Sequence, residues 1–261
     1  MTLLLHELKR NKLSLIIWSS AIAFLLGVCV LIYPEMAEQM KEMSDMFAEM
    51  GALSDAFGLD QLGFKDFMGY FALEFSEMLC LGGGLFAAIL GAGMLAKEEK
   101  DRTAEFLLTH PISRTSILTS KLLAMLIQIV LLNLATLIVT LICILAIGEQ
   151  VQAGTLALLF LAALILQLEI AAVTFGLSSL MRRGAIGVGL GLALGCYFMN
   201  LMANLSEEMK FLKFITPYGY ADSAQIASEG NIQIKYLAIG LAVMAASIAL
   251  AYKKYTSKDI A

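Results

Sequence analysis

The sequence predicts an all-α membrane protein with six transmembrane helices, organised as a single domain over residues 1–261. Two features of the composition favour this class: 59% of the 261 residues are hydrophobic and 15% are charged, whereas soluble domains average about 45–50% and about 25%. The third observation is that the hydrophobic residues gather in long runs, close to the length of about 20 residues that spans a bilayer. The net charge of −4 argues against a nucleic-acid partner.

Each span is predicted from one apolar run, in which small and weakly polar residues fill the positions between leucine, isoleucine and valine, as is typical of helices packed in lipid. Pro34 is expected to end the first span, because proline lacks the backbone N–H that a helix needs. That run is longer than a signal-peptide core and no small-residue cleavage site follows it, so we expect it to be retained. The predicted spans are 13–33, 67–95, 122–147, 155–180, 185–202 and 236–252.

The distribution of lysine and arginine predicts the orientation of the chain. If the N-terminus lies inside, most of the 18 lysines and arginines fall in the inner segments, as the positive-inside rule requires. We therefore expect both termini in the cytoplasm, and the protein in the cytoplasmic membrane of a bacterium or an archaeon.

Residues 2–10 predict a short amphipathic helix ahead of the first span. Leucines are interleaved there with polar residues that include His6, Glu7, Lys9 and Arg10. Such a helix can lie in the inner membrane interface before the chain turns into the bilayer. The leucines of this helix are Leu3, Leu4, Leu5 and Leu8.

The outer segment 34–66 opens with a second amphipathic pattern. A methionine-rich set and an acidic set each recur at spacings of three and four residues, so they fall on different faces of a helix. We expect this helix to pack at the outer mouth of the protein; the alternatives are an acidic vestibule that attracts cations and a copper(I) site at the methionine sulfurs. The two sets are Met36, Met40, Met43, Phe47 and Met50, and Glu35, Glu38, Glu42, Asp45 and Glu49.

The inner segment 96–121 is the most charged of the inner segments, and we expect it to dock a cytoplasmic partner. Residues 103–108 predict a short helix that Pro111 stops, because proline restricts the residue before it and lacks a donor. Ser113 is placed to cap a second helix that continues into the third span. The segment is therefore predicted as a helix, a break and a helix along the inner surface.

This segment resembles the membrane subunit of type-2 ABC exporters. The resemblance covers the layout of the whole chain, and its specific motifs cover a small part of it. These motifs are the string Glu98-Glu99 to Pro111-Ile112-Ser113-Arg114, the run Lys121-Leu122-Leu123-Ala124, the opening Glu7-Leu8-Lys9-Arg10-Asn11 and the element Thr216-Pro217-Tyr218-Gly219-Tyr220.

The resemblance implies that segment 96–121 holds the coupling helix of the family, on which a separate ATPase subunit docks. Two membrane subunits, identical or different, would then switch between inward-facing and outward-facing states as the ATPases close. This chain has no G-x-x-x-x-G-K-[ST] phosphate loop, so we expect ATP and Mg²⁺ in the partner and no cofactor in this chain. The residues assigned to coupling are Glu98, Thr103, Glu105, Phe106, Pro111 and Arg114.

Three carboxyl groups lie inside the predicted spans, where a charge is costly and suggests a function. Glu169 falls near the middle of the fourth span, close to Gln167, while Glu74 and Glu77 share one face of the second span. These residues either line a substrate path or are structural groups with hydrogen-bond partners. We expect Glu169 to be either neutral or paired with a polar group such as Asn133, Gln128 or Asn200.

Gly187, Gly191 and Gly195 recur every four residues in the fifth span, a spacing typical of close helix packing in membranes. In the family that the chain resembles, the first and fifth spans form the dimer seam, so we expect these glycines to pack against a second membrane subunit. The outer segment 203–235 is expected to form short helices that dip into the outer leaflet.

The leading hypothesis is the membrane-spanning subunit of an ATP-driven exporter, with an amphipathic drug or antimicrobial peptide as a candidate substrate. The alternative is an ion-gradient-driven carrier or channel that uses Glu169. An intramembrane protease is disfavoured, because the acidic motif that begins at Glu98 is one residue short of the EExxxR signature and both histidines, His6 and His110, lie outside the spans. No catalytic residue and no metal site is predicted.

Overall fold

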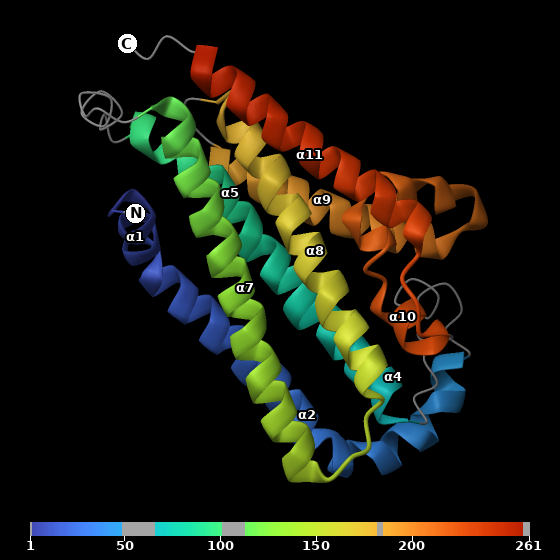
Figure 1. Cartoon of the computed structure of the whole chain (residues 1–261). Helices are drawn as coiled ribbons and strands as arrows, with labels where there is room; N and C mark the ends of the chain where they lie inside the picture. Colours follow the sequence, from blue (N-terminus) through green and yellow to red (C-terminus); the bar gives the residue numbers. More distant parts are fainter. Residues whose placement is uncertain (1, 49–65, 101–112, 182–184, 258–261) are drawn as a thin grey trace.

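The computed structural model describes residues 2–48, 66–100, 113–181 and 185–257, without the side chains of residues 2, 38–48 and 96–100. Within these ranges every regular element is a helix, and six helices are long and apolar enough to cross a membrane. Figure 1 shows that the beginning and the end of the chain lie toward the same end of the bundle. The predicted all-α fold with six spans is confirmed.

The helix bounds agree with most of the predicted elements. The amphipathic helix is α1 (Thr2–Arg10), and one residue separates it from α2 (Lys12–Ala48). The second span runs without interruption through α4 (Phe67–Phe75), the π-helical turn η1 (Ser76–Gly82) and α5 (Gly83–Lys100). The other spans are α7 (Arg114–Ile147), α8 (Ala153–Ser178), α9 (Ala185–Leu205) and α11 (Ile234–Ser257), and between the last two lie η2 (Glu207–Phe214), η3 (Pro217–Gly219) and α10 (Ser223–Glu229).

The end predicted for the first helix was wrong. Pro34 lies inside α2, which continues to Ala48, although an interior proline removes one backbone hydrogen bond and crowds the carbonyl group of the preceding turn. The ring of Tyr33 anchors this part of α2, packing edge-on against Phe67 at 5.0 Å and tilted against Tyr70 at 5.3 Å between ring centroids. The first part of the predicted outer segment is thus an extension of the first spanning helix.

The cap predicted for the third spanning helix was right. Ser113 has an extended backbone conformation, and its hydroxyl accepts a hydrogen bond from the Ser116 N–H at 3.2 Å. The helix therefore begins at Arg114 and continues without a break through the predicted third span. At its other end, Gly148 adopts the left-handed conformation (φ +73°) that commonly terminates helices.

Small residues bring the central helices together. Helices α5 and α8 lie in the middle of the bundle, with α2 and α7 on one side and α9 and α11 on the other (Figure 1). At Gly91 of α5, a Cβ atom would overlap the Ala171 carbonyl oxygen and the Thr174 hydroxyl of α8. At Gly189 of α9, it would lie 3.1 Å from the Ala92 side chain of α5. The backbones approach this closely because these positions carry no side chain.

The segment Glu207–Glu229, which we call the re-entrant segment, folds back into the bundle. The Thr216 hydroxyl donates to the carbonyl oxygen of Cys196, about halfway along α9, at 2.8 Å. The side chains of Tyr218 and Tyr220 are buried among the spanning helices. Irregular backbone is tolerated at membrane depth only where protein surrounds it or it lines a cavity, and this segment meets that condition. The short helices predicted in this region are confirmed.

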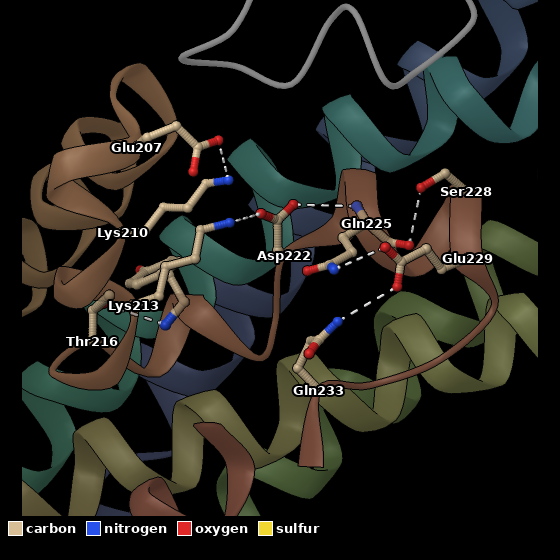
Figure 2. A network of polar contacts seen from close by, with 10 residues as sticks. Glu207, Lys210, Lys213, Thr216, Asp222, Gln225, Ser228, Glu229 and Gln233 are labelled. Carbon is tan, nitrogen blue, oxygen red and sulfur yellow. Dashed lines mark hydrogen bonds and ion pairs between the residues drawn. The ribbon is translucent and has the colours of Figure 1, made fainter. Parts of the chain in front are cut away.

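Polar contacts hold the re-entrant segment in shape (Figure 2). The Lys213 ammonium lies 3.1 Å from the Asp222 carboxylate, whose other oxygen caps α10 by accepting the Gln225 N–H at 3.3 Å. Gly219 is required between them, because a Cβ atom there would overlap the Lys213 carbonyl oxygen. These contacts fix the backbone of the re-entrant segment between Lys213 and Gln225.

We expect Gly91→Ala to lower the stability of the protein, because its methyl group would meet the Ala171 backbone and displace α8. Overpacking of this kind costs about 1–3 kcal/mol, so the melting temperature of the purified protein in detergent should fall. Gly93→Ala is the matched control, since a Cβ atom at Gly93 has no atom within 4 Å. An equal melting temperature for the two variants would contradict the close contact of α5 with α8.

Candidate functional site

A buried ion pair joins α1 to α7 at Lys121, the last residue of the predicted coupling segment 96–121. The fully buried Lys121 ammonium donates to Glu7 Oε1 at 2.8 Å and to the Met94 carbonyl oxygen of α5 at 2.8 Å. Glu7 therefore faces the bundle, and not the polar side of α1 that the sequence pattern indicated. A buried charge is strongly unfavourable without a partner, so Lys121 holds α1, α5 and α7 together at one point.

Arg114 makes a second link from α7, to the end of α11. Its guanidinium donates to the carbonyl oxygens of Tyr255 and Thr256, each at 3.3 Å. Cations are favourable at helix C-termini, where the last carbonyl groups lack helical donors. The hydroxyl groups of Thr119 and Tyr252 add a bond of 2.7 Å between the same two helices. We call the following residues the α7 network: Glu7, Met94, Arg114, Lys121, Tyr255 and Thr256.

Two of the six predicted coupling residues lie in described helices. Arg114 is the first residue of α7, and Glu98 lies near the end of α5, with its side chain outside the description. The other four lie outside the described residues: Thr103, Glu105, Phe106 and Pro111. The predicted coupling segment begins in the last turns of α5 and ends in the first turns of α7. The α7 network includes residues of both helices.

Gln167 links three elements in the middle of the bundle. Its fully buried side chain accepts a hydrogen bond from Asn133 of α7 at 2.7 Å and donates to the Leu79 carbonyl oxygen of η1 at 3.1 Å. Such π-helical turns are rare and occur frequently at functional sites. Gly83 makes room for the side chain, because a Cβ atom there would overlap the Gln167 amide. Both the oxygen and the nitrogen of this amide are thus bonded within the chain.

Glu169 is 5% exposed, and the Tyr220 hydroxyl of the re-entrant segment donates to its Oε2 at 2.7 Å. The polar partner is thus none of the examples that the sequence suggested, because the described chain shows no hydrogen bond to Glu169 from Asn133, Gln128 or Asn200. Gly240 of α11 gives the carboxyl group room, since a Cβ atom there would overlap Oε2. Burial, and then the neighbouring Glu169 carboxyl group, raise the pKa of Tyr220 above its ordinary value, so the phenol keeps the proton that it donates.

Glu74 and Glu77 have separate partners. The Tyr197 hydroxyl of α9 donates to both oxygens of Glu77, at 2.7 and 2.9 Å. The Cys29 thiol of α2 donates to Glu74 at 3.3 Å. Each carboxyl group is half-buried and connects the second span to a different neighbouring helix. Among the described contacts, none joins this pair to Glu169.

A cavity of about 520 Å³ lies beside Glu169, between α8, α9 and α11. Its wall is otherwise largely apolar, and Ile215 and Pro217 of the re-entrant segment form part of it. Of the four residues predicted for a substrate path, Glu169 lines this cavity, while Gln167, Glu74 and Glu77 do not.

The glycines predicted for dimer packing lie on an open part of α9. A Cβ atom at Gly187, Gly191 or Gly195 would meet no atom within 4 Å in the described chain. Gly191 and Gly195 also line the cavity beside Glu169. The neighbouring Gly189 differs, because it faces α5. The stripe is therefore not used for packing within the described part of this chain.

The described ranges contain no group of three or more His, Cys, Asp or Glu residues that could hold a metal ion. The side chains of most of the methionine stripe considered for copper(I), from Met40 onward, lie outside the description.

We expect Lys121→Ala to lower the melting temperature clearly, because it leaves the Glu7 carboxylate buried without its ammonium partner. Breaking a buried ion pair from one side costs about 3–5 kcal/mol. The double variant Glu7→Gln with Lys121→Met, which has neither charge, should recover part of the loss. Lys253→Ala, at an exposed lysine near the same end of the bundle, is the control. If it lowered the melting temperature as much as Lys121→Ala, the buried pair would not be the cause.

Comparison with known proteins identifies the family of the chain. The family model described as ABC-2 family transporter protein matches residues 1–260, which is nearly the whole sequence. A search of curated proteins returned no match. Proteins of the matching family are transport subunits in the membrane and are not the ATPases of their complexes. With its six spanning helices, the chain belongs to the ABC-2 transporter family and is a multi-pass membrane subunit of an ABC transporter.

Proposed function

We propose that this chain couples ATP hydrolysis by a separate ATPase subunit to the export of a substrate across the cytoplasmic membrane of a bacterium or an archaeon. The family supports an ATPase partner and a dimeric arrangement in general. ATP and Mg²⁺ would bind to the partner, because this chain has no phosphate loop.

The α7 network is the observation that carries the coupling proposal. The two helices at the ends of segment 101–112 are bonded to each other through Lys121 and Met94, at 2.8 Å. Lys121 also bonds α1, and Arg114 bonds the end of α11. The contacts of Lys121 are fully buried, and buried, close-packed groups are poorly compressible. A force applied to the segment by the ATPase would therefore move the ends of four helices together.

The predicted coupling residues would divide into two groups. The guanidinium of Arg114 bonds α11, so we assign it to transmission within the chain rather than to the ATPase contact. The residues left for the ATPase contact are Glu98, Thr103, Glu105, Phe106 and Pro111.

Among the polar residues of the spans, Glu169 is our candidate for the substrate path, because it lines the 520 Å³ cavity. Gln167 has both ends of its amide bonded within the chain, which supports a structural function. The same buried carboxyl group is the basis of the alternative of an ion-gradient-driven carrier that uses Glu169, which the family of the chain disfavours. That alternative needs no ATPase, so the experiment below separates the two.

We propose that the second membrane subunit, identical or different, packs on the face of α9 that includes Gly187. Leu194, Phe198 and Leu205 continue this face at spacings of seven, four and seven residues, a pattern typical of a seam between two helices, and all three are exposed. A step of four residues turns about 40° around a helix. Gly191 and Gly195 therefore turn away from this face and would border the seam.

A cysteine at Phe198 should cross-link two membrane subunits on oxidation in native membranes, in a background in which the four natural cysteines are serine. If the subunits differ, the second chain carries the cysteine at its corresponding position. Leu241→Cys, at an exposed position on α11, should remain monomeric on a non-reducing gel. Cross-linking at Leu241 alone, or at neither position, would contradict the proposed seam.

Co-purification with the candidate ATPase tests the coupling proposal. We expect the wild-type complex to form, Glu105→Ala to weaken the association, and Arg114→Ala to bind the ATPase but lower ATP hydrolysis by the complex roughly tenfold, or about 1.4 kcal/mol in the barrier. Lys253→Ala is the control and should match the wild type in both assays. If the chain binds no ATPase and neither variant has an effect, the coupling proposal fails and the gradient-driven carrier becomes the better explanation.

A further inference from the structure

The cavity beside Glu169 has the size and the composition of a site for an organic molecule. Its volume of about 520 Å³ lies within the range of about 300–1,000 Å³ that is usual for small-molecule sites. Aliphatic side chains from three helices form most of the wall, among them Val173 of α8, Val188 of α9 and Val243 of α11. A ligand of this cavity must therefore be mainly apolar.

Glu169 supplies the one carboxyl group in this wall. It lies within one turn of the midpoint of α8, at a depth where a carboxylate is costly unless a cation pairs with it. Tyr220 donates to Oε2, and none of the ion pairs among the described residues includes Glu169. A positively charged group in the cavity would complement it, whereas a second anion would be repelled.

The cavity is not enclosed by the described chain. Val188, Met199 and Val243 line it, and each of them is exposed. Figure 1 shows α9 and α11 on the same side of α8, so the opening lies between two spanning helices. A molecule dissolved in the bilayer can therefore reach Glu169 without crossing the polar ends of the bundle.

We propose that this cavity binds lipophilic monovalent cations, apolar molecules that carry one ammonium or a similar charge, and admits them sideways from the bilayer between α9 and α11. The cationic group pairs with the Glu169 carboxylate, and the apolar body lies against Val173, Val188 and Val243. This inference rests on the proposed export function, to which it adds a substrate class and a route of entry.

Rhodamine 6G, a lipophilic monovalent cation, is a suitable probe, and rhodamine B, which is zwitterionic at neutral pH, is its matched competitor. Binding is measured by fluorescence anisotropy on the chain in phosphatidylcholine nanodiscs, with and without its ATPase, and empty nanodiscs are subtracted. We expect saturable binding of rhodamine 6G, at least tenfold tighter than that of rhodamine B. Glu169→Gln, which keeps the size and an oxygen acceptor for Tyr220, should abolish this preference.

A second pair of variants tests the location of the site. Val243→Trp fills the cavity wall and should weaken binding at least tenfold. Leu241→Trp is the control on the same helix, because Leu241 is 43% exposed against 41% for Val243 and does not line the cavity. Gel filtration shows whether each variant folds.

Two results would overturn the inference: equal affinity of wild type and Glu169→Gln for rhodamine 6G, or equal affinity of the two tryptophan variants. Absence of saturable rhodamine 6G binding to the folded wild type would also overturn the inference. It would not change the result of the co-purification with the ATPase. Rhodamine 6G binding is also measured without the ATPase. If the ATPase does not associate with the chain, that result therefore contradicts the proposed export function and leaves the proposed binding site in the cavity open to its own test.

Discussion

Inside the hydrocarbon core of a membrane, a polar side chain or backbone group finds no water, and its partner must come from the protein. The buried polar contacts between the helices of this chain follow from that constraint, and they add to an apolar core that spans the bundle. Gln167 bonds α7 and the π-helical turn, Glu77 bonds Tyr197 of α9, and Lys121 bonds α1 and α5. In each case the hydrogen-bond partner lies on a different element. The hydrogen bonds of these buried polar groups therefore also favour one arrangement of neighbouring helices.

Polar contacts also connect the helices at one end of the bundle, where those of Lys121 are buried and those of Arg114 are partly exposed. The ammonium of Lys121 and the guanidinium of Arg114 both bond backbone carbonyl groups, on α5 and α11 respectively. These contacts lie at the first turns of α7, where the predicted coupling segment joins the bundle. If, as we propose, the motion that drives transport begins in a separate ATPase, a rigid connection of this kind would carry it to the spanning helices.

The re-entrant segment connects the structural constraint to the candidate substrate site. Tyr220 brings a hydroxyl to Glu169, Thr216 satisfies a carbonyl oxygen of α9, and Pro217 forms part of the cavity wall. Glycines at the contact points, such as Gly219 and Gly240, make these approaches possible. The cavity therefore lies where an irregular segment meets three spanning helices, and its acidic group is stabilised by a residue that is distant in sequence.

The sequence by itself determined the all-helical class and the six spanning helices, because apolar runs of membrane length and a capping serine such as Ser113 are local signals. It also identified Glu169 as unusual, since a carboxyl group inside an apolar run stands out without a structure. Only the tertiary structure decided the partners: Tyr220 replaced Asn133, Gln128 and Asn200 as the donor to Glu169, and Glu7 turned inward to Lys121. Pro34 remained inside its helix because Tyr33 packs on Phe67 and Tyr70. The physical reason is common to these cases: hydrophobicity and capping act over a few residues, whereas a hydrogen-bond or packing partner is selected by the fold from the whole chain.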